Sequence, residues 1–402
     1  MHRAGSSPSP PGVSGVPVSV DARTLTPWRA ITAFGLVSLA ADMVYEGARS
    51  VTGPLLATLG ASALAVGLIT GAGEAAALLL RLVSGPLADR TARYWALTIF
   101  GYGLTAVCVP LLAITPALGA AGLAVAGLLI VAERIGKAIR SPAKSALLAS
   151  AAGQVGRGRG FAVHKALDQI GAFAGPLLIA ALIAVFGTVS PALAFLAIPG
   201  AASMLLLVWL RRRFPEPETR HVSEISGHLP RRFYVFAAAV AFSTAGLVTF
   251  GLISYHASKT FSLAAVPILY AGAMAAGAVS ALISGHSYDK WGARVLYALP
   301  ALAAATPALA LSGSTAAIIT GTMLWGAAVG VQDSTVKALV ADLVAAPRRA
   351  TAYGVFAAIQ GVAALAGGAL AGGLYEHSIP LLAAILAVMQ LIAAGLLAVS
   401  RA

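Results

Sequence analysis

Gly85-Pro86-Leu87-Ala88-Asp89-Arg90 is a six-residue stretch with a counterpart in the second part of the chain, Gly285-His286-Ser287-Tyr288-Asp289-Lys290. Each copy follows a serine at the end of a long apolar run and precedes another apolar run. A glycine, an acid four residues on and then a base therefore recur in a short link between hydrophobic segments. Because the two copies stand half a chain length apart in 402 residues, the sequence predicts two homologous halves.

The repeated pattern resembles the loop between the second and third helices of the major facilitator superfamily, and its counterpart between the eighth and ninth. The second copy continues to Gly292 and Arg294 and matches the family form in full, whereas the first carries Ala92 where glycine is usual. The resemblance implies an all-α integral membrane protein of the MFS fold, with 12 transmembrane helices in two six-helix bundles related by pseudo-two-fold symmetry. It also implies a conformational latch formed by Gly85, Asp89, Arg90, Gly285, Asp289, Lys290 and Arg294.

Composition independently indicates a membrane protein. Hydrophobic residues make up 59% of the chain and charged residues 10%, against about 25% charged residues in soluble domains. Apolar runs of about 20 residues, the length that crosses the hydrocarbon core as a helix, recur along the sequence. Twelve such spans with short links would occupy almost all of the chain.

The net charge of +13 is distributed in a way that excludes nucleic-acid binding. Bases cluster in alternate links between the apolar runs, with Lys259 the main exception. This pattern is the positive-inside bias, which predicts a multi-pass protein of the inner or plasma membrane with both termini cytoplasmic. The single cysteine, Cys108, lies in an apolar run, so no disulfide can form within the chain.

Four segments follow from these patterns. Residues 1–27 are rich in Pro, Ser and Gly and are predicted to be a disordered cytoplasmic tail. Residues 28–211 form the predicted N-terminal six-helix bundle, 212–231 a cytoplasmic linker with several prolines and charges, and 232–402 the C-terminal bundle. The second helix is expected to end at residue 84, and the seventh to be continuous over 232–256.

Charged residues within the apolar runs carry most of the functional information. A charge at bilayer depth costs roughly 2.5–3.5 kcal/mol, so each should face a partner or a wet cavity. The first helix places three charged side chains and Tyr45 on one face, through spacings of three, four and seven. The predicted proton-coupling and substrate cavity comprises Asp42, Tyr45, Glu46, Arg49, Glu74, Glu133, Arg134, Lys137, Asp168, Gln332, Asp333, Lys337 and Gln360.

Asp42 and Glu74 have no opposite charge one turn away on their own helices. A buried carboxyl of this kind can carry a proton near neutral pH, so these two are the predicted coupling groups. Glu46 with Arg49, and Asp333 with Lys337, have the alternative of forming structural ion pairs within their helices.

A third motif, Gly171-Ala172-Phe173-Ala174-Gly175-Pro176, lies in the fifth expected helix. It resembles the Gly-x-x-x-Gly-Pro motif of family members that export by antiport. Small residues four apart also allow two helix backbones to approach closely, so plain packing is the alternative.

The favoured function is that of a secondary active transporter working by alternating access, in which proton-coupled antiport exports a small organic compound. Its expected partners are the small-molecule substrate, the proton and membrane lipid, and we expect a monomer. The sequence carries no catalytic signature, nucleotide loop or metal-ligand spacing, so no enzyme activity and no cofactor or metal is predicted. The alternatives are a proton-coupled symporter taking up a sugar, an organic acid or a peptide, and a non-transporting membrane receptor or sensor.

Overall fold

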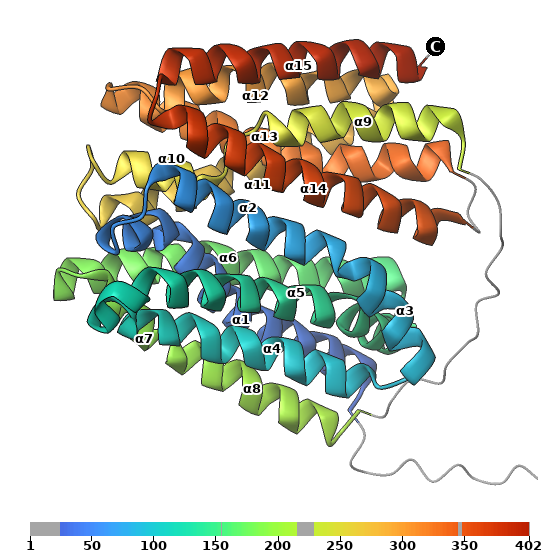
Figure 1. The fold of residues 1–402 in the computed structure, drawn as a ribbon. Coiled ribbons are helices and arrows are strands. Elements are labelled where there is room, and N and C mark those ends of the chain that lie inside the picture. Colours follow the sequence, from blue (N-terminus) through green and yellow to red (C-terminus); the bar gives the residue numbers. More distant parts are fainter. Residues whose placement is uncertain (1–24, 154, 215–228, 345–347, 402) are drawn as a thin grey trace, which may run out of the picture.

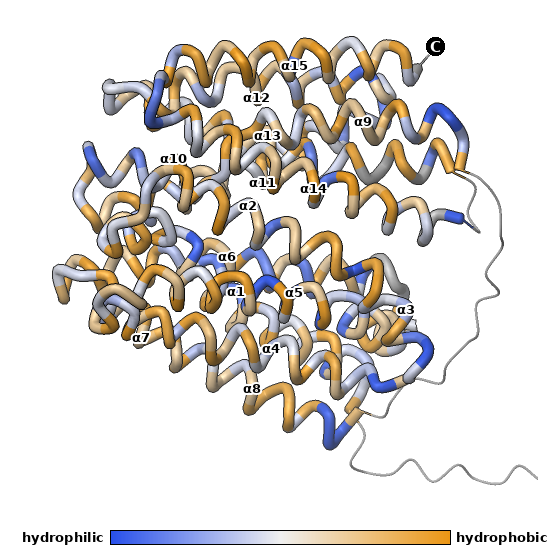
Figure 2. The backbone as a smooth tube through the Cα atoms, viewed as in Figure 1, coloured by the Kyte–Doolittle hydropathy of each residue, from blue (hydrophilic) through white to orange (hydrophobic). Residues whose placement is uncertain are grey.

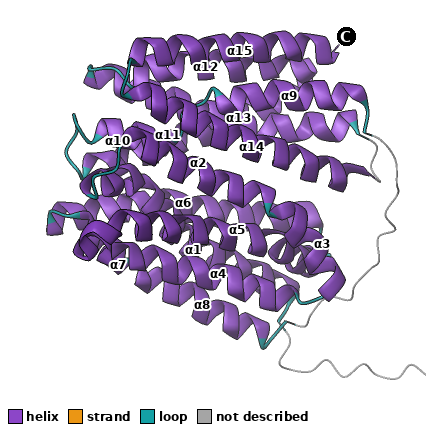
Figure 3. Ribbon diagram, in the orientation of Figure 1, coloured by secondary structure: helices purple, strands orange, loops and turns teal. Residues whose placement is uncertain are grey.

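The computed structural model describes residues 25–153, 155–214, 229–344 and 348–401, and every regular element in these ranges is helical (Figure 3). Most of the predicted tail and of the predicted linker therefore lies outside the described residues. The N-terminal half consists of α1 (Pro27–Thr58), α2 (Ala63–Leu79), α3 (Arg81–Thr91), α4 (Tyr94–Leu111), α5 (Gly122–Ala152), α6 (Arg157–Phe186), α7 (Val189–Phe195) and α8 (Ala197–Arg211). The C-terminal half consists of α9 (Arg231–Ala245), α10 (Phe250–Ala257), α11 (Ala265–Trp291), α12 (Ala298–Ala310), α13 (Thr315–Leu343), α14 (Arg349–Tyr375) and α15 (Ile379–Arg401).

The described part of the chain holds ten helical stretches that are long and apolar enough to cross a membrane. Helices are the expected result, because a membrane span must satisfy its backbone hydrogen bonds internally. Two stretches, of 59 and 46 residues, each contain two α-helices joined by a 3₁₀ segment. The all-α membrane fold is confirmed, whereas the number of twelve spans remains a prediction.

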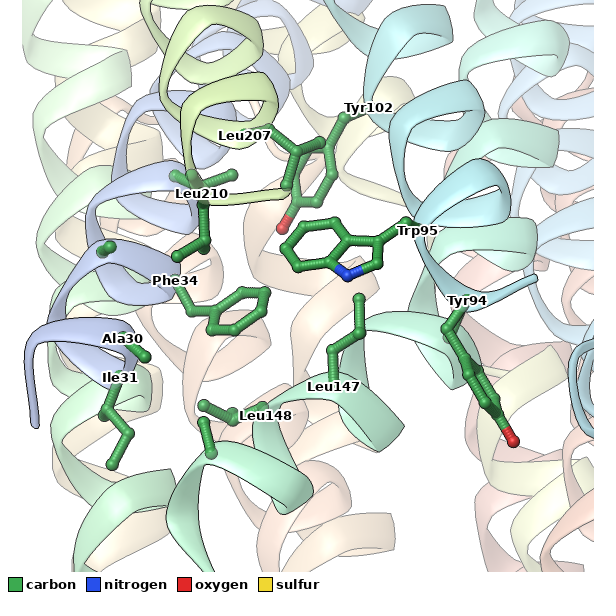
Figure 4. Packing of buried hydrophobic residues seen from close by; sticks show 14 of the residues in the cluster. Ala30, Ile31, Phe34, Tyr94, Trp95, Tyr102, Leu147, Leu148, Leu207 and Leu210 are labelled. Atoms are coloured by element: carbon green, nitrogen blue, oxygen red, sulfur yellow. The ribbon is translucent and has the colours of Figure 1, made fainter. Parts of the chain in front are cut away.

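Apolar side chains of each half pack mainly among themselves. In one cluster of the N-terminal half, Phe34 of α1 stacks on Trp95 of α4 with ring centroids 5.7 Å apart, and Leu147 and Leu207 pack around them (Figure 4). In the C-terminal half, Phe236 of α9 stacks on Phe356 of α14 at 5.8 Å. In Figure 1, α4 and α8 lie on one side of the molecule and α12 and α15 on the other.

The two ends of the molecule differ in charge. Figure 2 shows hydrophilic segments gathered at the end where α1 begins, α8 ends and α9 begins. We call this the basic end, because Arg90, Arg211, Arg231 and Lys290 lie there. The far end carries the links between α1 and α2, between α10 and α11, and between α14 and α15.

The helices differ from expectation at two points. The first copy of the motif, Gly85–Arg90, is helical and not a loop. The helix is interrupted at Leu80, and α3 begins at Arg81 and includes all six residues. The expected seventh helix is interrupted at residues 246–249, between α9 and α10. Trp325 of α13 donates its indole N–H to the Val248 carbonyl at 2.8 Å, which satisfies a backbone group that the break sets free.

The halves approach each other most closely through glycines near the far end. A Cβ on Gly67 of α2 would collide with the Gly368 backbone of α14, and one on Gly53 of α1 would collide with Gly251 of α10. Such contacts require residues without side chains, because they bring helix backbones together.

Candidate functional site

A network of charged side chains occupies the N-terminal half where it borders the C-terminal half. Arg49 of α1 donates from Nη2 to Oε1 of Glu74 of α2 at 2.9 Å. Arg134 of α5 places its Nη2 3.5 Å from the same oxygen. One carboxylate oxygen is thus held between two guanidinium groups from different helices. Glu74 and Arg49 retain 28% and 25% exposure, so this part of the network is accessible to solvent or substrate.

The network continues more deeply through Glu133 of α5. Its carboxylate lies 3.8 Å from Nε of Arg134 and 3.9 Å from Nη1 of Arg140. Thr105 of α4 donates to Glu133 Oε1 at 3.1 Å and accepts from Arg140. Because Glu133 is only 5% exposed, these partners offset the cost of burying its charge.

Tyr45 of α1 forms the centre of a cationic pocket. Lys137 Nζ lies 3.7 Å from its ring centroid, and the Arg134 guanidinium carbon lies 4.5 Å from it. A small cavity is lined by Tyr45, Arg49, Glu133 and Arg134, together with apolar side chains of α1, α4 and α5. The Nη1 group of Arg134 is buried and has no hydrogen-bond partner among the described residues.

Glu46 connects this network to the other half. Tyr270 of α11 donates its hydroxyl hydrogen to Glu46 Oε2, while Arg49 lies 3.9 Å from the same carboxylate oxygen. Tyr270 packs against Phe250 and Trp325, with ring centroids 4.3 and 6.3 Å away. These three rings form an aromatic trio of the C-terminal half, and Tyr270 is the member that contacts the charges of the N-terminal half.

Asp42 lies beside a second acid. Its carboxyl group lies close to that of Asp168 of α6, and Lys165 donates to Asp168 Oδ2 at 2.6 Å. The glycine motif makes this meeting possible, because side chains at Gly171 and Gly175 would collide with the α1 backbone at Leu39 and Met43. The motif thus does pack helices, and Pro176 continues within α6.

A further polar group extends from this pair toward the basic end. Ser38 of α1 meets Tyr102 of α4 at 3.1 Å and Nε2 of His164 of α6 at 2.9 Å. Lys144 of α5 donates to the same serine oxygen at 3.2 Å. His164 is buried, and its bond to Ser38 satisfies one ring nitrogen.

The polar residues expected in the C-terminal half lie in different surroundings. Gln332 of α13 donates to Thr244 Oγ1 at 3.1 Å, within its own half. Asp333 is exposed, Gln360 of α14 is half-buried, and the side chain of Lys337 lies outside the described residues, so the Asp333–Lys337 pair stays a prediction.

The two latch sequences occupy equivalent places in the two halves. Ser84 donates to the Ala138 carbonyl of α5 at 2.8 Å, and Ser284 meets Ser334 of α13 at 2.9 Å. The motif residues after them (Asp89, Arg90, Asp289, Lys290 and Arg294) are exposed or half-buried, and Gly85 and Gly285 have open space around them.

The Asp89 carboxylate accepts from the Tyr94 hydroxyl at 3.4 Å. Neither Asp89 nor Asp289 forms an ion pair with a base whose side chain the structure describes. The latch role of both motifs therefore remains a prediction.

Three contributors to the site were not anticipated: Thr105, Arg140 as a partner of Glu133, and Tyr270. Arg140 is only 4% exposed. Tyr270 carries no signal in the sequence, because an isolated tyrosine in an apolar run resembles ordinary packing. Its partner comes from the other half of the chain.

The chain matches the family model described as Major Facilitator Superfamily over residues 34–321 and 234–401. It is 52% identical over 381 residues to an uncharacterized protein of Mycobacterium tuberculosis (strain ATCC 25618 / H37Rv), covering 92% of both chains. It is 23% identical to an uncharacterized MFS-type transporter of Methanocaldococcus jannaschii, covering 86% of this chain and 88% of the relative.

Solved structures share the fold at low sequence identity. A point mutant of the nucleoside transporter NupG superposes with a TM-score of 0.73 at 14% identity, covering 92% of this chain and 99% of that one. A POT family transporter in complex with a thioalcohol-conjugated peptide gives 0.70 at 13% identity, covering 90% and 95%. A bacterial homologue of the human lysosomal transporter Spinster, inward-facing and occupied, gives 0.66 at 18%, covering 94% and 97%.

Proposed function

The chain belongs to the Major Facilitator Superfamily, and from that premise we propose that it is a secondary active transporter that exports a small organic compound in exchange for protons. It would work as a monomer by alternating access in the inner or plasma membrane. The basic end would face the cytoplasm, since Lys and Arg gather on the cytoplasmic side of membrane spans.

The observation that carries this proposal is the charged network between the halves. Buried charges are costly at membrane depth, so they are retained mainly where they serve an ion or substrate pathway. Glu74 lies between Arg49 and Arg134, and Glu46 reaches Tyr270 of the other half. A substrate site between two such bundles is the arrangement expected of transporters with repeated halves.

We assign proton coupling to Asp42 and Asp168. Two carboxyl groups that lie close together share a proton readily, because two adjacent carboxylates repel each other. Glu74 was an equal candidate by sequence, since its own helix offers no base. Its two guanidinium partners come from α1 and α5, so its carboxylate is engaged in ion pairs within the network.

The cavity supports recognition of a compound that carries both a hydrogen-bond acceptor and an apolar or aromatic part. The Nη1 group of Arg134 can donate to an acceptor, because it lacks a partner among the described residues. The apolar side chains that line the cavity, such as Val109 and Ile130, can contact the apolar part.

The test starts from a thermal-shift screen of the purified protein against a panel of organic compounds. Each stabilising compound is then added to proteoliposomes that hold a pH-sensitive dye and an acidic interior. Antiport predicts that the external compound drives protons out of the vesicles. Asp42→Asn should abolish this response, whereas Asp342→Asn, an exposed acid of α13, should leave it intact. Proton movement that is unchanged in Asp42→Asn would overturn the assignment of the coupling site.

A second function, proton-linked symport of an organic acid, is favoured by the three cations near Tyr45: Arg49, Arg134 and Lys137. They could bind an anionic substrate by charge-assisted hydrogen bonds. The same assay separates the two functions, because in symport the entering compound would carry protons into the vesicles.

A further inference from the structure

A second polar cluster lies at the far end, away from the charged network. It gathers His256 at the end of α10, Lys259 just after it, and Tyr375 and Glu376 at the end of α14. The two residues of α14 are adjacent, but they bond in different directions. Tyr375 points into the C-terminal half, and Glu376 reaches the N-terminal half.

The hydrogen bonds around His256 define its tautomer. Its Nε2 lies 2.8 Å from the Ser312 carbonyl oxygen, which can only accept, so Nε2 carries the hydrogen. In the neutral ring Nδ1 is then an acceptor, and it receives the hydroxyl hydrogen of Tyr375 at 2.7 Å. Lys259 donates to the same hydroxyl oxygen at 3.2 Å. The chain from Lys259 through Tyr375 to His256 is complete only when His256 is neutral.

Glu376 joins the two halves. Its Oε1 accepts from the backbone N–H of Ala63, the first residue of α2, at 2.7 Å. The α2 N-terminus has another cap within its own half, because Ser62 accepts from Ala65 N at 3.1 Å. A carboxylate at this place satisfies a free N–H and also interacts favourably with the positive end of the helix dipole.

The charged and titratable groups that face His256 are few. Tyr375 bonds to its ring, and Lys259 lies against the same hydroxyl and against the Tyr255 and Tyr375 rings, 5.0 Å from each centroid. Glu376 is the C-cap residue of α14, directly after Tyr375. From α1 and α2, which also pack against α10, the described contacts come from uncharged residues such as Gly53 and Thr70.

We propose that Glu376 forms a second latch, separate from the motif residues at the basic end. This far-end latch holds the halves together, and protonation of His256 releases it. A proton on Nδ1 turns this acceptor into a donor, so Tyr375 loses the partner for its hydroxyl hydrogen. It also places a second positive charge beside the hydroxyl that Lys259 already occupies. Because Tyr375 precedes Glu376 in the chain, displacement of its side chain moves the last turn of α14, which carries the latch.

The latch has a place in alternating access. Opening at the far end must separate α2 from α14, and the Glu376–Ala63 bond is a polar contact across that boundary. If the far end faces the outside, an acidic exterior would favour the outward-open state. The proposal depends on alternating access but not on which acid couples protons.

The test measures opening directly, so no substrate is needed. Spin labels are attached at Leu118→Cys, between α4 and α5, and at Gly313→Cys, between α12 and α13, in a Cys108→Ala background. Leu118 is exposed and Gly313 has open space around it, so the labels disturb little packing. Distance distributions in lipid nanodiscs then give the ratio of open to closed far ends.

At pH 8, Glu376→Ala should raise the open-to-closed ratio about three- to tenfold, the effect of losing one charge-assisted bond at a helix end. Glu376→Gln, which keeps an acceptor oxygen, should have a smaller effect. His377→Ala is the matched control, because His377 bonds to Gly373 within its own helix. An unchanged distribution in Glu376→Ala would overturn the latch.

Lowering the pH from 8 to 5, the range in which histidine takes up charge, should raise the same ratio in the otherwise unaltered protein. His256→Gln should remove this acid response, since glutamine can still bond to Tyr375 and Ser312 but cannot become charged. His377→Gln should keep it.

The response must also survive in an Asp42→Asn background. If Asp42→Asn abolished the acid response and His256→Gln did not, the role of His256 as the pH sensor would be refuted. The proposed proton coupling at Asp42 would then still stand. If the acid response survived in Asp42→Asn and that variant still exchanged protons, the assignment of proton coupling to Asp42 would be wrong. The far-end latch at Glu376 would then still stand.

Discussion

The N-terminal half and the C-terminal half share a framework but differ in the chemistry that they bring to the interface. In the N-terminal half, Gly171 of α6 lets its backbone meet α1 at Leu39. In the C-terminal half, Gly367 of α14 meets α9 at Ala245 in the corresponding way. At the level of the side chains this likeness ends. The described ion pairs all lie in the N-terminal half, whereas the other half contributes the aromatic trio of Phe250, Tyr270 and Trp325.

A hollow on the C-terminal half fits the same contrast. It is lined by apolar side chains of α9, α14 and α15, including Phe242, Ala363 and Met389. The difference teaches that packing and charge are distributed differently: close glycine contacts occur in both halves, whereas the described ion pairs lie in one. Substitutions in paired positions can test this division.

The largest effect is expected at Arg134, a buried base that lies next to two acids of the network. Arg134→Ala removes a base next to Glu74 and Glu133, and breaking a buried ion pair from one side costs about 3–5 kcal/mol. Thermal unfolding in detergent should show a large loss of stability, together with loss of transport. Arg90→Gln, an exposed base of α3, should change stability by less than about 0.5 kcal/mol. Equal stability of both variants would mean that the network is not structural.

The next effect concerns the contact between the charged network and the aromatic trio. Tyr270→Phe keeps the ring and removes the hydroxyl that donates to Glu46, a bond to a charged group worth about 1.5–3 kcal/mol. Unfolding measurements should report this loss, and Glu46→Gln should reduce the effect of Tyr270→Phe in a double-mutant cycle. Additive effects would show that the two side chains do not interact. Tyr234→Phe, at an exposed tyrosine of α9, is the control.

Both halves use a glycine for a close contact between helix backbones, so filling that glycine should lower stability equally in each half. Gly171→Val and Gly367→Val each force a side chain into a neighbouring backbone, and overpacking of this kind costs about 1–3 kcal/mol. Gly395→Val of α15, where a side chain meets open space, controls for the loss of a helical glycine. A large effect in only one half would contradict the shared framework.

The smallest effect is expected where the first motif departs from the second. Ala92 has a left-handed backbone, with φ of 53°, where the second copy uses Gly292 with φ of 57°. Ala92→Gly should therefore raise stability by up to about 1 kcal/mol, because glycine accepts positive φ without strain. The reverse change, Gly292→Ala, should lower stability. A loss of stability in Ala92→Gly would show that chain entropy outweighs the strain.

Several features of the fold could be predicted from the sequence because they depend on local composition. Runs of apolar residues indicated membrane helices, and the repeated Gly-to-base motif indicated two halves. The prediction of the motif's own conformation was wrong, since Gly85 and Asp89 lie within α3 rather than in a loop. The end of an apolar run shows where the hydrophobic residues stop, but it does not show where the helix stops. The helix can continue through further hydrophilic residues.

The sequence by itself determined the membrane class, the helices and which of them carry charge, because hydropathy and periodicity act along one chain segment. Only the tertiary structure decided which partner each charge meets. Glu74 had no base on its own helix, but it lies between guanidinium groups of α1 and α5, and Asp42 met another acid on α6. The physical reason is range: an ion pair forms only within a few ångströms, and helix periodicity fixes which side chains share a face but not which helix lies opposite.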